Sequence, residues 1–257
     1  MSKRRKGVLV LSEGRSGSNW LGSLAHNAGL GHSKEWLDPK MLGIDPSKTD
    51  YSTYFEAALE RSSEGCAGFY VKIFPRHLYE MREAFGMDFI AYCHNHHDVA
   101  LITLTRADRL RQAVSFSRAL QSSQWTARND ETRRPEYDFQ QIARCLFTIT
   151  RSYSFWEDYL RITGFDATGF VYEDLVPNAN PFLAHIAKYL GACEPEHVES
   201  DLRVQRDEVT EEWLTRFKAD AADEDLLDAA SPVRPTRSRK AFLRLLKKKN
   251  IRLPYTF

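Results

Sequence analysis

Close to its N-terminus the chain has a short apolar run, which leads through a glycine-rich turn into a segment whose apolar residues have helical spacing. The run is "GVLVL" (residues 7–11), and "SEGRSGSNWL" (residues 12–21) follows it. Apolar side chains recur at helical spacing over residues 18–28, and Gly29 and Gly31 then end the helix. A strand, a glycine-rich turn and a helix in this order present backbone N–H groups and the positive helix end to an anion. This order predicts an α/β fold with an anion site after the first strand.

The residues of the turn suit a phosphate group. Gly14 and Gly17 let the backbone approach a ligand closely, the hydroxyls of Ser16 and Ser18 are donors, and Arg15 adds a permanent positive charge. The turn lacks the Lys that follows the last glycine in the phosphate loop of nucleoside triphosphatases. Taken alone, it fits either an anion site or an ordinary strand-to-helix turn.

Strands and helices alternate along the rest of the chain, which is typical of a parallel sheet with helices on both faces. Further strands are predicted at residues 68–74, 99–105 and 169–175, and further helices at 76–86, 109–120, 137–160 and 181–191. No internal repeat or linker divides the chain. We therefore expect one three-layer α/β domain of the phosphate-loop type over residues 1–230, followed by a basic C-terminal extension over residues 231–257.

The longest predicted helix carries a single apolar seam. Its members recur at alternating steps of three and four residues: Phe139, Ile142, Leu146, Ile149, Tyr153, Trp156 and Leu160. The seam indicates packing against the core. A helix-pair interface in a homodimer is the alternative.

Composition limits the classes of partner. A formal net charge of +1 gives no general attraction to nucleic acid. No apolar run is long enough to span a bilayer, and the four cysteines lie too far apart for a zinc motif or a disulfide framework. The stretch "HNHHD" (residues 94–98) lacks the spacing of a helical metal site and predicts a polar loop instead. We expect a cytoplasmic protein without bound metal, whose basic segment 234–252 is a solvated helix or a docking patch for an anion or a membrane surface.

A second cationic site follows the third predicted strand. Arg106 comes directly after that strand, and Ser115 lies on the next helix. Because the carboxyl ends of parallel strands meet at one edge of a sheet, Arg106 is expected at the same edge as the glycine-rich turn. An Arg and a hydroxyl together suit a phosphate, although Arg106, Arg109 and Arg111 also fit a solvated helix start. Two such sites at two strand ends indicate one ligand with two separated anionic groups.

Several segments together resemble a known family. They are "GRSGSNWL", "VKIF", "LTRADRLRQAVSFSRA" with "QSSQW" after it, and "VYEDLVPNANPFLAHIAKYLG". In this order they are similar to sulfotransferases that use 3′-phosphoadenosine-5′-phosphosulfate (PAPS), and most similar to the bacterial carbohydrate group that includes trehalose 2-sulfotransferase. The resemblance extends over about residues 7–218.

The resemblance implies where the donor binds. The 5′-phosphosulfate would lie on the first loop, formed by Gly14, Arg15, Ser16, Gly17, Ser18, Asn19 and Trp20. Arg106 and Ser115 match the pair that binds the 3′-phosphate. Tyr172 lies in the region that borders the nucleotide, or else is a buried tyrosine with a satisfied hydroxyl.

The resemblance also implies a reaction, which is in-line transfer of a sulfuryl group from PAPS to a hydroxyl of a carbohydrate or glycolipid, without a metal. Arg15 and Lys72 would neutralise charge on the leaving phosphate. Phe74 replaces the histidine base of animal relatives, and the role of general base passes to Glu35 by resemblance to the trehalose group. The candidates for acceptor binding, with surface or core positions as the alternative, are His32, Trp36, Asp38 and Trp125.

Two other classes of function stay open. A small-molecule kinase on a related phosphate-loop fold is one, although the turn lacks its lysine. The other is a non-enzymatic anion-binding or scaffold protein that docks a partner through the basic tail.

Overall fold

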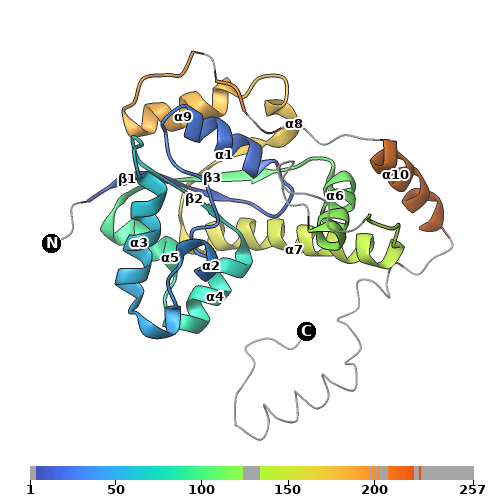
Figure 1. The fold of residues 1–257 in the computed structure, drawn as a ribbon, viewed down its shortest axis with the longest axis horizontal. Coiled ribbons are helices and arrows are strands. Elements are labelled where there is room, and N and C mark those ends of the chain that lie inside the picture. The colour runs from blue at the N-terminus through green and yellow to red at the C-terminus, as the bar shows by residue number, and fades with distance from the viewer. Residues whose placement is uncertain are drawn as a thin grey trace, which may run out of the picture.

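The structure is a computed structural model, and it describes residues 4–123, 134–196, 198–200, 202, 208–222 and 226. At its centre lies a four-stranded parallel sheet in the order β2-β1-β3-β4 (Figure 1). The strands are β1 (Lys6–Leu11), β2 (Phe69–Ile73), β3 (Asp98–Thr105) and β4 (Ala167–Val171). The helices are α1 (Ser18–Asn27), α2 (Pro39–Leu42), α3 (Tyr51–Ser63), α4 (Pro75–Phe85), α5 (Phe89–His96), α6 (Arg109–Ser122), α7 (Phe139–Thr163), α8 (Tyr172–Leu175), α9 (Asn180–Leu190) and α10 (Glu208–Asp220), with a 3-10 turn η1 at Pro46–Lys48.

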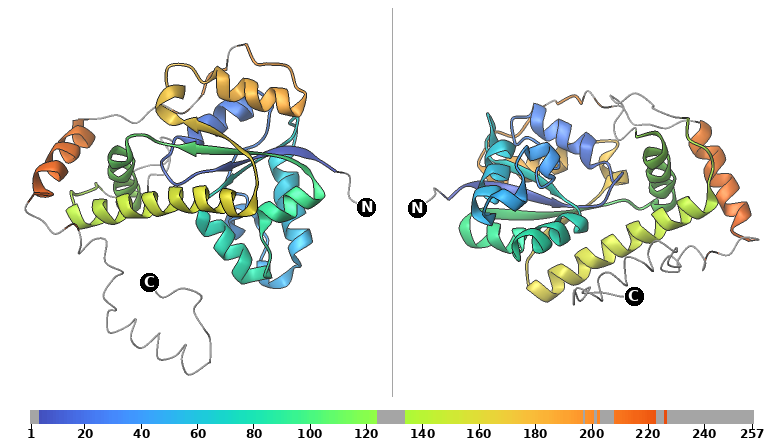
Figure 2. Two further views of the ribbon diagram at one scale, coloured as in Figure 1. Left: turned by 180° about the vertical axis from the view of Figure 1, so that it is seen from behind. Right: turned by 60° about the horizontal axis from the view of Figure 1, so that its bottom comes forward.

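The sheet separates two apolar layers. Side chains alternate across β1, so that Val8 and Val10 face one layer and Leu9 and Leu11 face the other. Helices α1, α8 and α9 cover the first face, and α3, α4, α5 and the C-terminal half of α7 cover the second (Figures 1 and 2). The predicted α/β fold, with a central parallel sheet between two helical layers, is confirmed.

A third apolar cluster lies beyond the end of the sheet. Helix α6, the N-terminal half of α7 and α10 pack together there around Ile142, Ile149, Trp213 and Phe217. Both views in Figure 2 show α10 beside α6. The seam of α7 is buried within the chain, so its predicted role in core packing is confirmed.

The strand register places the candidate site. Leu11 of β1 is level with Ile73 of β2 and with Thr103 of β3, so the three strands end close to one another. The glycine-rich turn after β1, the residues after Ile73 and the residues after Thr105 therefore share one edge of the sheet, as the sequence predicts.

The fourth predicted strand is wrong at its end. Residues 172–175 form the short helix α8, in which the N–H of Val176 donates to the carbonyl of Tyr172. The reason is that β3 ends at Thr105, which pairs with Val171, so no strand is left for the following residues to pair with.

The prediction of a polar loop at residues 94–98 is also wrong. His94 and His96 belong to α5, whose N-terminus is capped by Asp88. His97 is buried, with Nε2 2.8 Å from Oε1 of Glu56. These residues therefore link α5 and the start of β3 to the core.

The predicted basic extension over residues 231–257, with its docking alternative, lies outside the described residues. Among the described helices, none is both long enough and apolar enough to cross a membrane.

The N-terminal cap of α7 gives a first prediction. The Asp138 carboxylate accepts the N–H of Gln141 at 2.9 Å. We expect Asp138→Ala to lower the free energy of unfolding by about 1 kcal/mol, because the helix loses this cap. Urea denaturation measures the loss, with Asp138→Asn as the control because Asn caps equally well. Equal losses in the two variants would contradict the assignment of the cap.

Candidate active site

The turn after β1 adopts a backbone conformation that requires glycine at one position. Gly17 is the N-cap residue of α1, has φ of 88°, and has no side chain that could accept from the N–H groups of the first helical turn. A Cβ on Gly17 would lie 2.2 Å from the ring of Tyr172. Arg15 also has a positive φ, 64°. The N–H groups at the start of α1 are therefore presented next to Tyr172 without a capping side chain.

Buried polar side chains hold this turn from behind. The Glu13 carboxylate accepts the N–H of Gly14 at 2.7 Å and the hydroxyl of Ser152 on α7. Gln112 of α6 donates to the Gly14 carbonyl at 2.8 Å and accepts the hydroxyl of Tyr153 at 2.9 Å. Sequence reasoning missed Glu13, Gln112 and Ser152. For Gln112 and Ser152 the available signal was a polar residue beside the apolar face of a helix.

Arg15, Arg106 and Ser115 come together at this edge of the sheet. Arg15 donates from Nε to the Ser115 hydroxyl at 2.9 Å, and Arg106 donates from Nη1 to the backbone carbonyl of Arg15 at 3.2 Å. Burial of the guanidinium, followed by the charges of Arg106 and Arg118, lowers the pKa of Arg15 to about 10. Arg15 thus contacts both members of the predicted 3′-phosphate pair, and its charge also lowers the pKa of Lys72.

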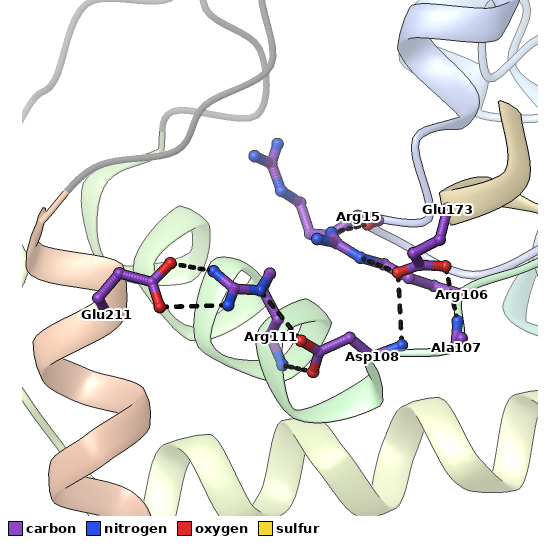
Figure 3. A network of polar contacts seen from close by, with 7 residues as sticks. All are labelled: Arg15, Arg106, Ala107, Asp108, Arg111, Glu173 and Glu211. Carbon is purple, nitrogen blue, oxygen red and sulfur yellow. Dashed lines mark hydrogen bonds and ion pairs between the residues drawn. The ribbon is translucent and has the colours of Figure 1, made fainter. Parts of the chain in front are cut away.

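Glu173 anchors Arg106 from the other side (Figure 3). Its carboxylate accepts from Nε of Arg106 at 3.3 Å and from the backbone N–H groups of Ala107 at 2.8 Å and Asp108 at 3.3 Å. The ring of Tyr172, which is buried, lies 4.9 Å from the Arg106 guanidinium. Arg106 is therefore fixed on several sides before any ligand binds.

A polar pocket of about 250 Å³ adjoins Arg106. Its lining residues are Arg106, Asp108, Arg111, Glu173 and Glu211. Arg111 pairs with both Asp108 and Glu211, and so ties the start of α6 to α10 (Figure 3).

Lys72 connects the glycine-rich turn with Glu35. Only 3% of the Lys72 side chain is exposed, and its ammonium donates to the side-chain oxygen of Asn19 at 2.6 Å. The same ammonium lies 3.5 Å from Oε1 of Glu35. Burial lowers the pKa of Lys72, and the nearby Glu35 carboxylate opposes that shift. Residues from α1, β2 and the segment after α1 thus meet at one buried charge.

The position of Glu35 follows from a short pairing at the edge of the sheet. Lys34 forms a parallel bridge with Val71 of the edge strand β2, which brings the chain back to the sheet after α1. Glu35 then faces Lys72, Arg76 and His77. Burial alone raises the pKa of Glu35, but the His77 imidazole and the charges of Lys72 and Arg76 outweigh it and lower that pKa to about 2.

The four candidates for acceptor binding have different positions. Trp36 packs in the core, and its indole N–H donates to the carbonyl of His32 at 2.6 Å. The His32 ring stacks on His26, and Asp38 caps α2 through the N–H of Lys40. Trp36 thus has a core position and Asp38 caps a helix, and acceptor binding by these residues stays a prediction. Trp125 lies outside the described residues.

The family is shown by a comparison of the sequence. A family model described as Stf0 sulphotransferase matches residues 77–220, more than half of the chain. The chain belongs to the Stf0 sulfotransferase family. The matched region of this Stf0 sulfotransferase includes Arg106, Ser115 and Tyr172, whereas the glycine-rich turn, Glu35 and Lys72 precede it.

Two proteins similar to this Stf0 sulfotransferase differ in how closely they match. Trehalose 2-sulfotransferase of Mycolicibacterium smegmatis is 28% identical over 131 residues, which are 50% of this chain and 49% of that protein. The match thus spans about half the length of that relative. The sulfotransferase domain of a Synechococcus olefin synthase has 14% identity and a TM-score of 0.40, over 99% of this chain and 98% of that one.

Gly17 gives a prediction with a matched control. We expect Gly17→Ala to lower the free energy of unfolding by about 1–2 kcal/mol or more, because alanine is strained at positive φ and its Cβ meets Tyr172. At Gly14 an added Cβ would lie 3.4 Å from Phe116, which is ordinary contact. Thermal unfolding of the two variants should show the larger loss for Gly17→Ala. A larger loss for Gly14→Ala would contradict the description of the turn.

Proposed function

We propose that this Stf0 sulfotransferase transfers a sulfuryl group from PAPS to a hydroxyl of a carbohydrate or glycolipid acceptor. The position of Lys72 is the observation that carries the proposal. Its buried ammonium lies between Asn19, at the end of the predicted phosphosulfate loop, and Glu35, the predicted base. One cation thus contacts both the predicted phosphosulfate loop and the predicted base.

The residues of the turn fit the 5′-phosphosulfate of the donor. Ser16 is fully buried, and its hydroxyl has no hydrogen-bond partner among the residues described. Buried hydroxyls without a partner are rare in folded proteins, which favours a ligand at this position. The uncapped N–H groups that begin α1 lie on the same turn and suit an anion.

The cluster of Arg15, Arg106 and Ser115 supports a site for the 3′-phosphate. The charge of Arg106 is one cause of the lowered pKa of Arg15, because the two guanidinium groups repel each other. A dianionic phosphate would remove this repulsion and would accept hydrogen bonds from both guanidinium groups and from the serine hydroxyl. Tyr172 and Trp20, whose rings pack edge to face, are the proposed border of the nucleotide.

The reaction forms a bond between the acceptor oxygen and sulfur, and breaks the bond between sulfur and the 5′-phosphate oxygen. The electron pair of the broken bond stays on adenosine 3′,5′-bisphosphate, which leaves. Glu35 takes the acceptor proton, and Lys72 stabilises the negative charge on the leaving phosphate. When Lys72 turns toward that phosphate, Glu35 loses one of the charges that lower its pKa and becomes a stronger base.

Free thiols support the cytoplasm as the proposed compartment. Cys66, Cys93, Cys145 and Cys193 form no disulfide, and Cys93 and Cys145 are buried. Reduced thiols are typical of the cytosol. Cell fractionation tests the proposal, which recovery of the protein outside the cytosol would contradict.

Arg106→Ala tests the site for the 3′-phosphate. We expect it to weaken binding of adenosine 3′,5′-bisphosphate by about tenfold to a hundredfold, because a charge-assisted hydrogen bond to the phosphate is lost. Affinity for adenosine 5′-monophosphate, which lacks the 3′-phosphate, should change much less. Isothermal titration measures both ligands, with Ser115→Ala as a milder variant and ATP as a control ligand. Equal losses for the two adenosine nucleotides would contradict the site, and tight ATP binding would favour a kinase.

Glu35→Gln tests the base. We expect the rate of sulfuryl transfer to fall by about a hundredfold or more, because the amide does not take the acceptor proton. The affinity for adenosine 3′,5′-bisphosphate should stay nearly unchanged. Transfer of radiolabelled sulfate from PAPS to trehalose, other sugars and cell extracts measures the rate. Equal loss of rate and nucleotide affinity would remove Glu35 from the role of base.

A further inference from the structure

His77 is a buried histidine that the proposed reaction does not yet use. It lies in the first turn of α4, is fully buried, and stacks on Phe74 with ring centroids 5.2 Å apart. Its Nδ1 accepts the backbone N–H of Phe74 at 3.2 Å. A neutral imidazole that accepts at one nitrogen carries its proton on the other. His77 is therefore a hydrogen-bond donor at Nε2.

This donor is directed at Glu35. Nε2 of His77 lies 3.7 Å from Oε2 of Glu35, just beyond hydrogen-bond distance, and no other partner occurs among the described residues. An unsatisfied buried N–H costs free energy, so a small approach of the carboxylate is favourable. Sequence reasoning missed His77.

The other charges around Glu35 are divided between its two oxygens. Arg76 also donates to Oε2, but its side chain is 53% exposed, so water screens the pair. Lys72 faces Oε1. The carboxylate thus has one oxygen on the side of α4 and the other toward Lys72 and the glycine-rich turn.

We propose that His77 is a positioning residue that anchors Oε2 of Glu35 through its Nε2–H, with help from Arg76, so that Oε1 is oriented to take the acceptor proton. This inference rests on the proposed role of Glu35 as base. The proton passes from the acceptor hydroxyl to Oε1 as the bond between oxygen and sulfur forms. His77 itself gains and loses no proton.

The contact with Phe74 fixes the tautomer of the neutral His77 ring. A proton on Nδ1 would point at the N–H of Phe74. The neutral ring therefore carries its proton on Nε2, on the side of Glu35.

Two substitutions separate positioning from structure. Asn at position 77 keeps an acceptor for the Phe74 N–H and loses the donor to Glu35, whereas Gln keeps the donor and, as at the N3 position of a capping box, also offers an acceptor to the Phe74 N–H. We expect His77→Asn to keep the thermal midpoint but to lower kcat by about tenfold to a hundredfold, with little change in the KM for PAPS. Its kcat should also fall off at a higher pH on the acid side, because Glu35 loses a donor that favours its ionised form. His77→Gln should keep kcat within about threefold and should also keep the thermal midpoint, because Gln can accept the Phe74 N–H at this position.

The reverse order, with kcat lost in His77→Gln and kept in His77→Asn, would overturn the inference. A readout independent of transfer is the nitrogen-15 shift of the His77 ring between pH 5 and 9, assigned by its loss in His77→Asn. We expect the neutral ring to be protonated at Nε2. A neutral ring protonated at Nδ1 also overturns the inference. If the ring behaves as expected and PAPS supports no transfer, the proposed function fails while the geometry of His77 stands.

Discussion

The buried ammonium of Lys72 is the contact on which the candidate site depends. A charge that is 97% removed from solvent needs close polar partners, because its lost hydration is otherwise uncompensated. Asn19 and Glu35 supply them from two segments that are distant from Lys72 in sequence. The edge strand β2, the start of α1 and the segment paired with Val71 are thereby held together. A single charge thus joins the proposed donor site to the proposed base.

The rest of the site is built before a ligand arrives. Glu13 and Gln112 fix the glycine-rich turn from the side of α6 and α7. Glu173 fixes Arg106, and the Ser115 hydroxyl accepts from Arg15. Two guanidinium groups so close together repel each other until an anion lies between them. This arrangement gives a preorganised cationic site, which is the proposed site of the 3′-phosphate.

Elements with strong periodicity were predictable, and contacts between distant segments were not. The apolar runs predict β1, β2 and β3, and apolar residues at helical spacing predict α1 and α7, because burial on one face sets the spacing. Helix α3 was missed because its pattern follows several short turns, from Asp38 to Asp50. Glu35 beside Lys72 depends on one bridge, which leaves no periodic signal, and was assigned only through the family resemblance. His77 was not predicted because it lies three residues beyond Phe74, the position at which the family resemblance places a histidine.

A crystal structure of this Stf0 sulfotransferase with adenosine 3′,5′-bisphosphate would test whether Lys72 links the donor site to the base. We expect the 5′-phosphate on the N–H groups after Gly17, with the Lys72 ammonium moved toward it from Glu35. We expect the 3′-phosphate on Arg106 and Ser115. A nucleotide bound elsewhere, or bound on the turn with Lys72 still against Glu35, would contradict the claim that Lys72 links donor and base.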